Sequence, residues 1–269
     1  METNINRTAL NISTYCNLKC KHCLAFIPYY KSCDRKNMTA EEAEKTLTEY
    51  FRVVDSVEHF TVTGGEPLLN PNTHDILALV YRHLNQIRGS VDFVTNGTLL
   101  IPDEILDLFE EHREHTRVVL SDYGKNLSVK LEEVRKSLEQ RGIRYRISKF
   151  YGDNLYYDGW IDFTDHSQKW FTQEERDANA RKCIHRVGKY FVINDGELHC
   201  CSRSFWRIKN HIIPKIEGEF VPLTDDGVPL EKKRQLLMTM YQMDSSTSCA
   251  YCVGLCNGVP RVRPAQQLD

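Results

Sequence analysis

The stretch that decides the fold is Cys16-Asn-Leu-Lys-Cys20-Lys-His-Cys23, which places three cysteines within eight residues, after the apolar-alternating segment 9–12. Three thiolates this close can bind one iron–sulfur cube, because cysteine thiolates are the usual ligands of such clusters. A cube needs one ligand more than three cysteines supply, so one iron would stay free to hold a second molecule. A zinc ion would prefer a closed tetrahedron of ligands. His22 is poorly placed to complete it, because it is adjacent to Cys23.

Length and composition set the limits of the function. The chain has 269 residues, enough for one large α/β domain or a larger domain with a small appendage. Its formal net charge of −2 argues against a nucleic-acid partner. No segment approaches the roughly 18 apolar residues of a membrane span, and the N-terminus lacks a signal segment. We therefore expect a cytoplasmic protein with no membrane partner, reduced thiols and no disulfide framework.

The first two-thirds of the chain alternates strand-like and helix-like patterns. The expected strands are 8–13, 60–63, 91–94, 118–120 and 143–150, with an aromatic and acidic segment at 151–163 as the sixth. Four helices are expected between these strands. The first begins at a capping box at 39–42, the second runs through 76–87, the third starts at Pro102, and the fourth extends over 127–138. Strands that alternate with helices predict a parallel sheet joined by right-handed crossovers.

The notable polar motifs all follow expected strands. The cysteine loop follows the first strand. The next three strands are followed by Thr63-Gly-Gly-Glu-Pro67, Thr95-Asn-Gly-Thr98 and Ser121-Asp-Tyr-Gly124. Active sites of parallel barrels lie in the loops after the C-terminal ends of the strands. The four motifs are therefore expected to meet at one rim and to form one site.

The spacing C-x3-C-x2-C, with the ring of His22 before the last cysteine, and the turn Gly64-Gly65-Glu66 resemble the radical S-adenosylmethionine (SAM) superfamily over residues up to about 150. The resemblance implies an α/β fold, a partial (β/α)6 TIM-like barrel. It also implies a [4Fe–4S] cluster, with SAM on its open iron. The cluster ligands would be Cys16, Cys20 and Cys23.

The same resemblance assigns the remaining cofactor contacts. The backbone of Gly64 and Gly65 and the acid of Glu66 would hold the methionine amino group. Asn96 and Ser121 match the strand-end residues that contact the ribose and the methionyl carboxylate, and His22 would lie beside the cofactors. Taken alone, the glycine pair also fits a plain βα turn, and Asn96-Gly97 is a standard turn signal.

A second group of cysteines lies in the last third of the chain. Cys183 precedes an expected hairpin at 192–199 with an Asp195-Gly196 turn, and Cys201 follows it. Cys249 and Cys252 follow an expected helix at 230–243. The pattern C-x12-G-x4-C, then C-x2-C, resembles the twitch module, a shortened SPASM extension. It implies a second, auxiliary [4Fe–4S] cluster on these four cysteines.

Two points about this rear group follow from the residues alone. A zinc ribbon made of the same four cysteines is the alternative to a cluster. Cys200 is expected to point away from Cys201, because neighbouring strand residues face opposite sides. Taken together, the two resemblances divide the chain into a radical SAM partial barrel at 1–165 and a small β-hairpin-plus-helix module for the auxiliary cluster at 166–269.

The resemblance implies cleavage of SAM to a 5′-deoxyadenosyl radical that abstracts a substrate hydrogen. A fully ligated auxiliary cluster can accept the remaining electron of an oxidation. The favoured hypothesis is therefore an oxidoreductase acting on a small polar or sugar-like alcohol, served by an electron donor such as flavodoxin or ferredoxin. Arg203 is a candidate for anchoring the substrate or acting as a base. Few residues precede the first expected strand, so no leader-binding domain is expected there.

Two alternatives stay open. An epimerase or cross-linking enzyme acting on a peptide or a sugar would need a thiol that returns a hydrogen atom, and Cys256, Cys200 and Cys33 are the candidates. A non-catalytic iron–sulfur or zinc-binding protein is the other alternative, although the Gly-Gly-Glu turn has no purpose in it.

Overall fold

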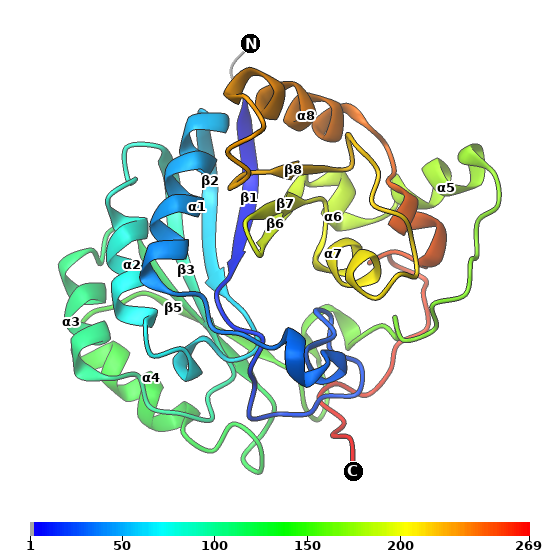
Figure 1. The fold of residues 1–269 in the computed structure, drawn as a ribbon. Coiled ribbons are helices and arrows are strands. Elements are labelled where there is room, and N and C mark those ends of the chain that lie inside the picture. Colours follow the sequence, from blue (N-terminus) through cyan, green and yellow to red (C-terminus); the bar gives the residue numbers. More distant parts are fainter. Residues whose placement is uncertain (1–2) are drawn as a thin grey trace.

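Strand β1 (Asn4–Asn11) lies within an eight-stranded sheet of order β5-β4-β3-β2-β1-β6-β7-β8 in the computed structural model, which describes residues 3–269 (Figure 1). Neighbouring strands are parallel from β5 to β6, whereas β7 and β8 pair antiparallel. The other strands are β2 (Ser56–Thr63), β3 (Ile87–Thr95), β4 (Thr116–Asp122), β5 (Tyr145–Lys149), β6 (Tyr190–Asn194), β7 (Glu197–His199) and β8 (Phe220–Pro222). The sheet does not close, which confirms the expected partial barrel.

Helices lie on the outside of this sheet (Figure 1). The crossovers between β1 and β5 carry α1 (Ala40–Val53), α2 (Thr73–Tyr81), α3 (Asp103–Glu111) and α4 (Leu131–Gln140). The later helices are α5 (Gln173–Ala180), α6 (Ile184–Val187), α7 (Ser202–Lys209) and α8 (Leu230–Gln242). The capping box at Thr39 and Glu42 is confirmed, and the buried Tyr50 of α1 meets Thr8 of β1 through a 2.7 Å hydroxyl contact.

Two sequence predictions about the barrel were wrong. Residues 151–163 form no strand; an isolated bridge pairs Trp160 with Val262. Positive φ at Asn154, Tyr157 and Asp158 is incompatible with a regular strand. The sixth parallel strand is β6, which pairs with β1 on the opposite side of the sheet from β5. The helix expected to reach Ile87 ends at Tyr81, and Ile87 begins β3.

The predicted hairpin and final helix are confirmed. Strands β6 and β7 are joined by Asp195 and Gly196, whose positive φ values of 51° and 72° suit the tight turn expected for an Asp-Gly pair. Strand β8 and helix α8 complete this region, and its buried residues join the same apolar core as the barrel. The division of the chain at residue 165 stays a prediction. No helix within residues 3–269 is long and apolar enough to cross a membrane.

Candidate functional site

The motifs that follow β1 to β4 meet at one cavity of about 410 Å³ at the rim of the sheet. Its wall includes seven of the residues predicted from the sequence: Cys16, Cys20, Cys23, Gly64, Gly65, Asn96 and Ser121. Aromatic side chains complete the wall, among them Tyr123 of the motif after β4, Phe150, and Trp160 of the aromatic segment 151–163. Two predicted cofactor residues, Glu66 and His22, do not line this cavity.

The Gly64-Gly65 pair is required by the cysteine loop itself. A Cβ on Gly65 would lie 2.1 Å from the carbonyl oxygen of Tyr15, and one on Gly64 would lie 2.6 Å from that of Ser13. Gly65 N donates to Ser13 O over 2.7 Å, and Glu66 N donates to Tyr15 O over 2.8 Å. The close approach therefore holds the turn after β2 against the loop that carries the cysteines.

Glu66 joins the ends of β2 and β3. Its buried carboxylate accepts hydrogen bonds from Thr95 Oγ1 (2.9 Å), Leu68 N (3.1 Å) and Asn96 N (2.8 Å). Burial raises the pKa of Glu66 to about 7, although these hydrogen bonds act in the opposite direction. The carboxylate thus fixes the strand ends, and its contact with a methionine amino group stays a prediction.

The other predicted cofactor residues differ in their surroundings. Asn96 Nδ2 donates to Asn17 Oδ1 over 3.1 Å and lies 3.7 Å from Cys16 Sγ, so its amide reaches the cysteine loop. Ser121 lies at the end of β4 on the cavity wall. His22 is buried, and its Nδ1 lies 3.2 Å from Asp162 Oδ1. The geometry therefore favours cofactor contact by Asn96 and Ser121 over contact by His22.

The three front thiols fit a metal cluster. Burial raises the pKa of Cys16 to about 12 and that of Cys20 to about 11, so their thiolates need a nearby cation. Binding to a metal deprotonates a thiol outright. Leu18 N donates to Cys16 Sγ over 3.4 Å, as befits a thiolate ligand. Cys16, Cys20 and Cys23 would therefore hold the [4Fe–4S] cluster at the cavity.

A charged cluster inside the barrel was missed by sequence reasoning. Arg7 Nη1 donates to Asp92 Oδ2 over 2.7 Å, and Arg117 binds both oxygens of the same carboxylate at 2.9 and 2.7 Å. Arg7 also lines the 410 Å³ cavity. Part of the signal was available, because Asp92 interrupts the apolar run 91–94, whereas Arg7 lies in the largely polar strand β1 and Arg117 precedes the apolar run of β4.

The rear cysteines line a second, smaller cavity of about 20 Å³. Five thiols line it: Cys183, Cys200, Cys201, Cys249 and Cys252. The prediction that Cys200 faces away was wrong. β7 ends at His199, so the strand alternation does not extend to Cys200, and its thiol contacts that of Cys201. No three Cys, His, Asp or Glu side chains within residues 3–269 converge on a single metal ion, whereas a cube spreads its ligands over several irons.

Buried arginines surround the rear thiols. Arg203 is 2% exposed, and its Nε and Nη1 have no hydrogen-bond partner within residues 3–269. The thiols of Cys252, Cys201 and Cys183 raise the pKa of Arg203 against the effect of burial. An unpaired buried guanidinium requires negative charge nearby. Four thiolates around a cube carry a net charge of about −2, which fits this requirement.

Arg207 stabilises a turn, and Cys256 lies outside both cavities. Arg207 donates to Ser248 O (2.8 Å), Ser248 Oγ (3.0 Å) and Tyr251 O (2.8 Å), and so holds the turn that carries Cys249. Cys256 Sγ lies 3.7 Å from Val253 O, and this thiol lines neither cavity. Arg203 also lies outside the 410 Å³ cavity.

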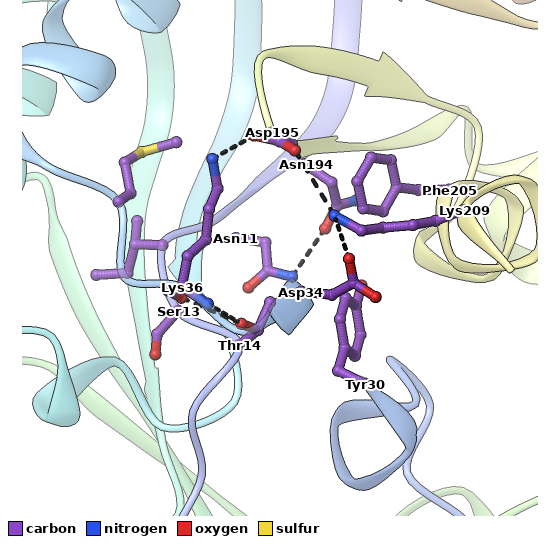
Figure 2. A pocket seen from close by; sticks show the side chains of 12 residues that line it. Asn11, Ser13, Thr14, Tyr30, Asp34, Lys36, Asn194, Asp195, Phe205 and Lys209 are labelled. Atoms are coloured by element: carbon purple, nitrogen blue, oxygen red, sulfur yellow. Dashed lines mark hydrogen bonds and ion pairs between the residues drawn. The ribbon is translucent and has the colours of Figure 1, made fainter. Parts of the chain in front are cut away.

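A polar contact network ties the front loop to the rear hairpin (Figure 2). Asn11 Nδ2 donates to Asn194 Oδ1 over 2.8 Å across β1 and β6. Lys36 pairs with Asp195, and Lys209 Nζ lies 3.6 Å from Asp34 Oδ1. These contacts hold the two cysteine regions in a fixed relation.

An open parallel barrel whose rim carries three cysteines around a cavity can hold an iron–sulfur cluster beside a second molecule. Residues 10–121 match the Radical SAM superfamily, so the chain carries a radical SAM domain. The family implies a [4Fe–4S] cluster and SAM. The match ends before the rear cysteines, which it does not describe.

Known proteins resemble the chain to different extents. The subtilosin biosynthesis protein AlbA of Bacillus subtilis is 25% identical over 238 residues, 81% of this chain and 47% of that protein. A GTP 3′,8-cyclase of Alkaliphilus metalliredigens is 28% identical over 101 residues, 37% of this chain and 30% of the cyclase. The chain thus spans less than half the length of these two relatives.

Two solved structures share the fold along the whole chain. BtrN in complex with AdoMet and 2-DOIA has a TM-score of 0.56 at 15% identity, with 100% of both chains covered. Native anSMEcpe with bound AdoMet has a TM-score of 0.53 at 13% identity, and the match covers 96% of this chain and 93% of that chain. At these identities the likeness concerns the fold alone.

Proposed function

We propose that this radical SAM enzyme is an oxidoreductase that removes two electrons from a small polar or sugar-like alcohol. The observation that carries the proposal is the second cavity, in which cysteines surround an arginine that has no carboxylate partner within residues 3–269. The fold match to BtrN, solved with AdoMet and 2-DOIA, supports a small ligand in the front cavity.

The chain's own residues would serve this reaction in distinct ways. When bound, SAM on the front cluster supplies the radical that takes a hydrogen atom, and the rear cluster supplies an acceptor for the electron left after proton loss. Cys183, Cys201, Cys249 and Cys252 would hold the rear cluster. The aromatic wall of the front cavity excludes water from the reacting carbon. Arg7 adds a positive charge to the wall of that cavity.

The test is product analysis with anaerobically reconstituted enzyme, SAM, a reductant and a panel of sugar-like alcohols. We expect a product two electrons more oxidised than its substrate, with one SAM consumed per turnover. A product of unchanged mass that carries one solvent deuterium after reaction in D₂O contradicts the proposal.

A peptide-modifying epimerase or cross-linking enzyme is the second candidate. The match to AlbA, a protein of bacteriocin biosynthesis, over 81% of the chain favours it. An epimerase needs a hydrogen donor near the substrate, whereas Cys256 lies away from the front cavity. If the protein is nevertheless an epimerase that uses one of these thiols as the hydrogen donor, Cys256→Ala or Cys200→Ala would stop product formation while 5′-deoxyadenosine is still made.

The remaining expectations about partners also belong to the proposal. An external electron donor such as flavodoxin or ferredoxin would reduce the front cluster. The cytoplasmic location and the lack of nucleic-acid and membrane partners stay predictions from composition.

A further inference from the structure

Segment 262–268, from the far end of the sequence, lies along the front cysteine loop. In Figure 1 the red end of the chain lies beside the dark-blue loop that follows β1. Lys21 N donates to Gln266 O over 2.7 Å, and Leu268 N donates to Lys19 O over 2.8 Å. Cys20 and Gln267 thus face each other in an antiparallel bridge. The backbone of the segment is fixed on both sides of one cluster cysteine.

The same segment also binds the loop that carries Trp160. Val262 and Trp160 exchange two backbone hydrogen bonds of 2.8 and 3.2 Å. Trp160 belongs to the wall of the 410 Å³ front cavity. Segment 262–268 therefore connects the cavity wall to the cysteine loop.

The side chain of Gln267 is directed at the sulfur of Cys20. Its Oε1 accepts from Lys19 N over 2.7 Å, and its Nε2 donates to Ala265 O over 2.7 Å and to Cys20 Sγ over 3.3 Å. Cys20 is 7% exposed, so its sulfur is largely shielded from solvent, and Gln267 is half-buried. An amide held at both ends cannot turn away from the sulfur without losing two other hydrogen bonds.

This contact distinguishes Cys20 from its neighbours. Cys16 Sγ receives N–H groups from Leu18 in the same loop and from Asn96 at the end of β3. Cys20 receives its side-chain donor from a residue 247 positions away. Sequence spacing gives no indication of such a pair.

We propose that Gln267 is a positioning residue for the SAM-cleaving cluster, and that its amide makes this cluster easier to reduce; this rests on the proposed function of Cys16, Cys20 and Cys23. An N–H group directed at a ligand sulfur stabilises the extra negative charge of the reduced cluster. Hydrogen bonds to sulfur and exclusion of solvent are among the terms that set cluster potentials.

The test compares Gln267→Met and Gln267→Glu with Gln266→Met and Gln266→Glu in the full, reconstituted chain. Gln267→Met removes all three polar contacts of the amide, whereas Gln267→Glu keeps the acceptor for Lys19 N and loses the donor to Ala265 O and Cys20 Sγ. Gln266 is exposed, so its variants control for shape and added charge. The readout is the midpoint potential of the front cluster, followed by electron paramagnetic resonance in a redox titration. Iron content is measured alongside.

We expect a lower midpoint potential in both Gln267 variants and an unchanged potential in both Gln266 variants, at equal iron content. Faster amide hydrogen exchange at Lys19 in Gln267→Met, but not in Gln266→Met, is expected as an independent sign of the contact. Unchanged potentials in both Gln267 variants overturn the proposal, as does loss of front iron without any change in exchange. A wild-type chain without a SAM-responsive cluster would instead contradict the proposed function, and the exchange result would still decide the contact.

Discussion

The two cysteine groups differ in how the chain assembles them and in the space around them. The front thiols come from one loop of eight residues and line a cavity of about 410 Å³. The rear thiols come from three segments spread over residues 183–252 and line a cavity of about 20 Å³. A second molecule therefore has room beside the front group but not beside the rear group, as a radical-generating site and an electron acceptor require.

The arginines near the two cavities differ in the same sense. Near the front cavity, Arg7 and Arg117 share the carboxylate of Asp92. Near the rear cavity, Arg203 faces thiols and the ring of Phe163, with its guanidinium carbon 4.2 Å from the ring centroid. The front guanidinium groups thus share a protein carboxylate, whereas Arg203 has no carboxylate partner within residues 3–269.

The largest expected effect tests the front group. Replacing Cys16, Cys20 and Cys23 together with Ala should reduce 5′-deoxyadenosine release to background, because no thiolate would remain to hold the SAM-binding cluster. Iron should fall by about half, with four of roughly eight irons retained by the rear group. Cys33→Ala is the matched control, since this exposed thiol lines neither cavity. A triple variant that still releases 5′-deoxyadenosine would contradict the assignment.

The second prediction tests the rear group in that triple variant. The remaining iron should be lost after replacement of any one of the four proposed ligands: Cys183→Ala, Cys201→Ala, Cys249→Ala or Cys252→Ala. Cys200→Ala should retain it, because Cys200 is not among the four proposed ligands; its Sγ donates a hydrogen bond to Ser246 Oγ over 3.2 Å.

In the chain with an intact front group, the four ligand variants should still make 5′-deoxyadenosine but lose oxidised product by at least about a hundredfold. Cys256→Ala serves as the control and should keep the iron. Zinc in place of iron at this site would refute the electron-acceptor role.

The same contrast explains what the sequence could predict. The front group was predictable because its ligands share one loop and its partners follow strands of one parallel sheet, where a single rule places them at one rim. Cys200 was misplaced because strand alternation ends with β7 at His199. The position of β6 beside β1 could not be predicted, because a crossover of about forty residues leaves either edge of an open sheet reachable. Gln267 gave no signal at all, since its contact depends on two segments from opposite ends of the sequence.

The third prediction concerns the paired arginines. Asp92→Asn should lower the free energy of unfolding by about 3–5 kcal/mol at pH 7, because two guanidinium groups lose their counter-charge. Burial tends to raise the pKa of Asp92, but the hydrogen bonds from Arg117 and Arg7 outweigh it and hold the pKa below its usual value.

Because the folded-state pKa of Asp92 is below the unfolded value, its stabilisation is present above the unfolded pKa and is lost as pH falls through the folded pKa. The difference between wild type and variant should therefore shrink at acid pH, below about 3.9. Urea unfolding from pH 7 downwards measures it. A difference that stays constant with pH would show that Asp92 acts through packing rather than charge.

The smallest expected effect tests the unpaired arginine. In the front triple variant, Arg203→Met should speed chelator-driven release of the rear iron by a few-fold, up to about tenfold, which corresponds to about 1.4 kcal/mol. The reason is that the guanidinium of Arg203, together with that of Arg186 in the same cavity, offsets a cluster charge of about −2. Arg207 is held by carbonyl and hydroxyl oxygens. Arg203→Lys should retain most of the protection, because it keeps the charge. Arg7→Met is the matched control, since that guanidinium is already paired with Asp92 and should not affect the rear iron. Equal release rates in wild type and Arg203→Met would mean that the rear site balances its charge in another way, and the contrast between the two regions would then rest on cavity size alone.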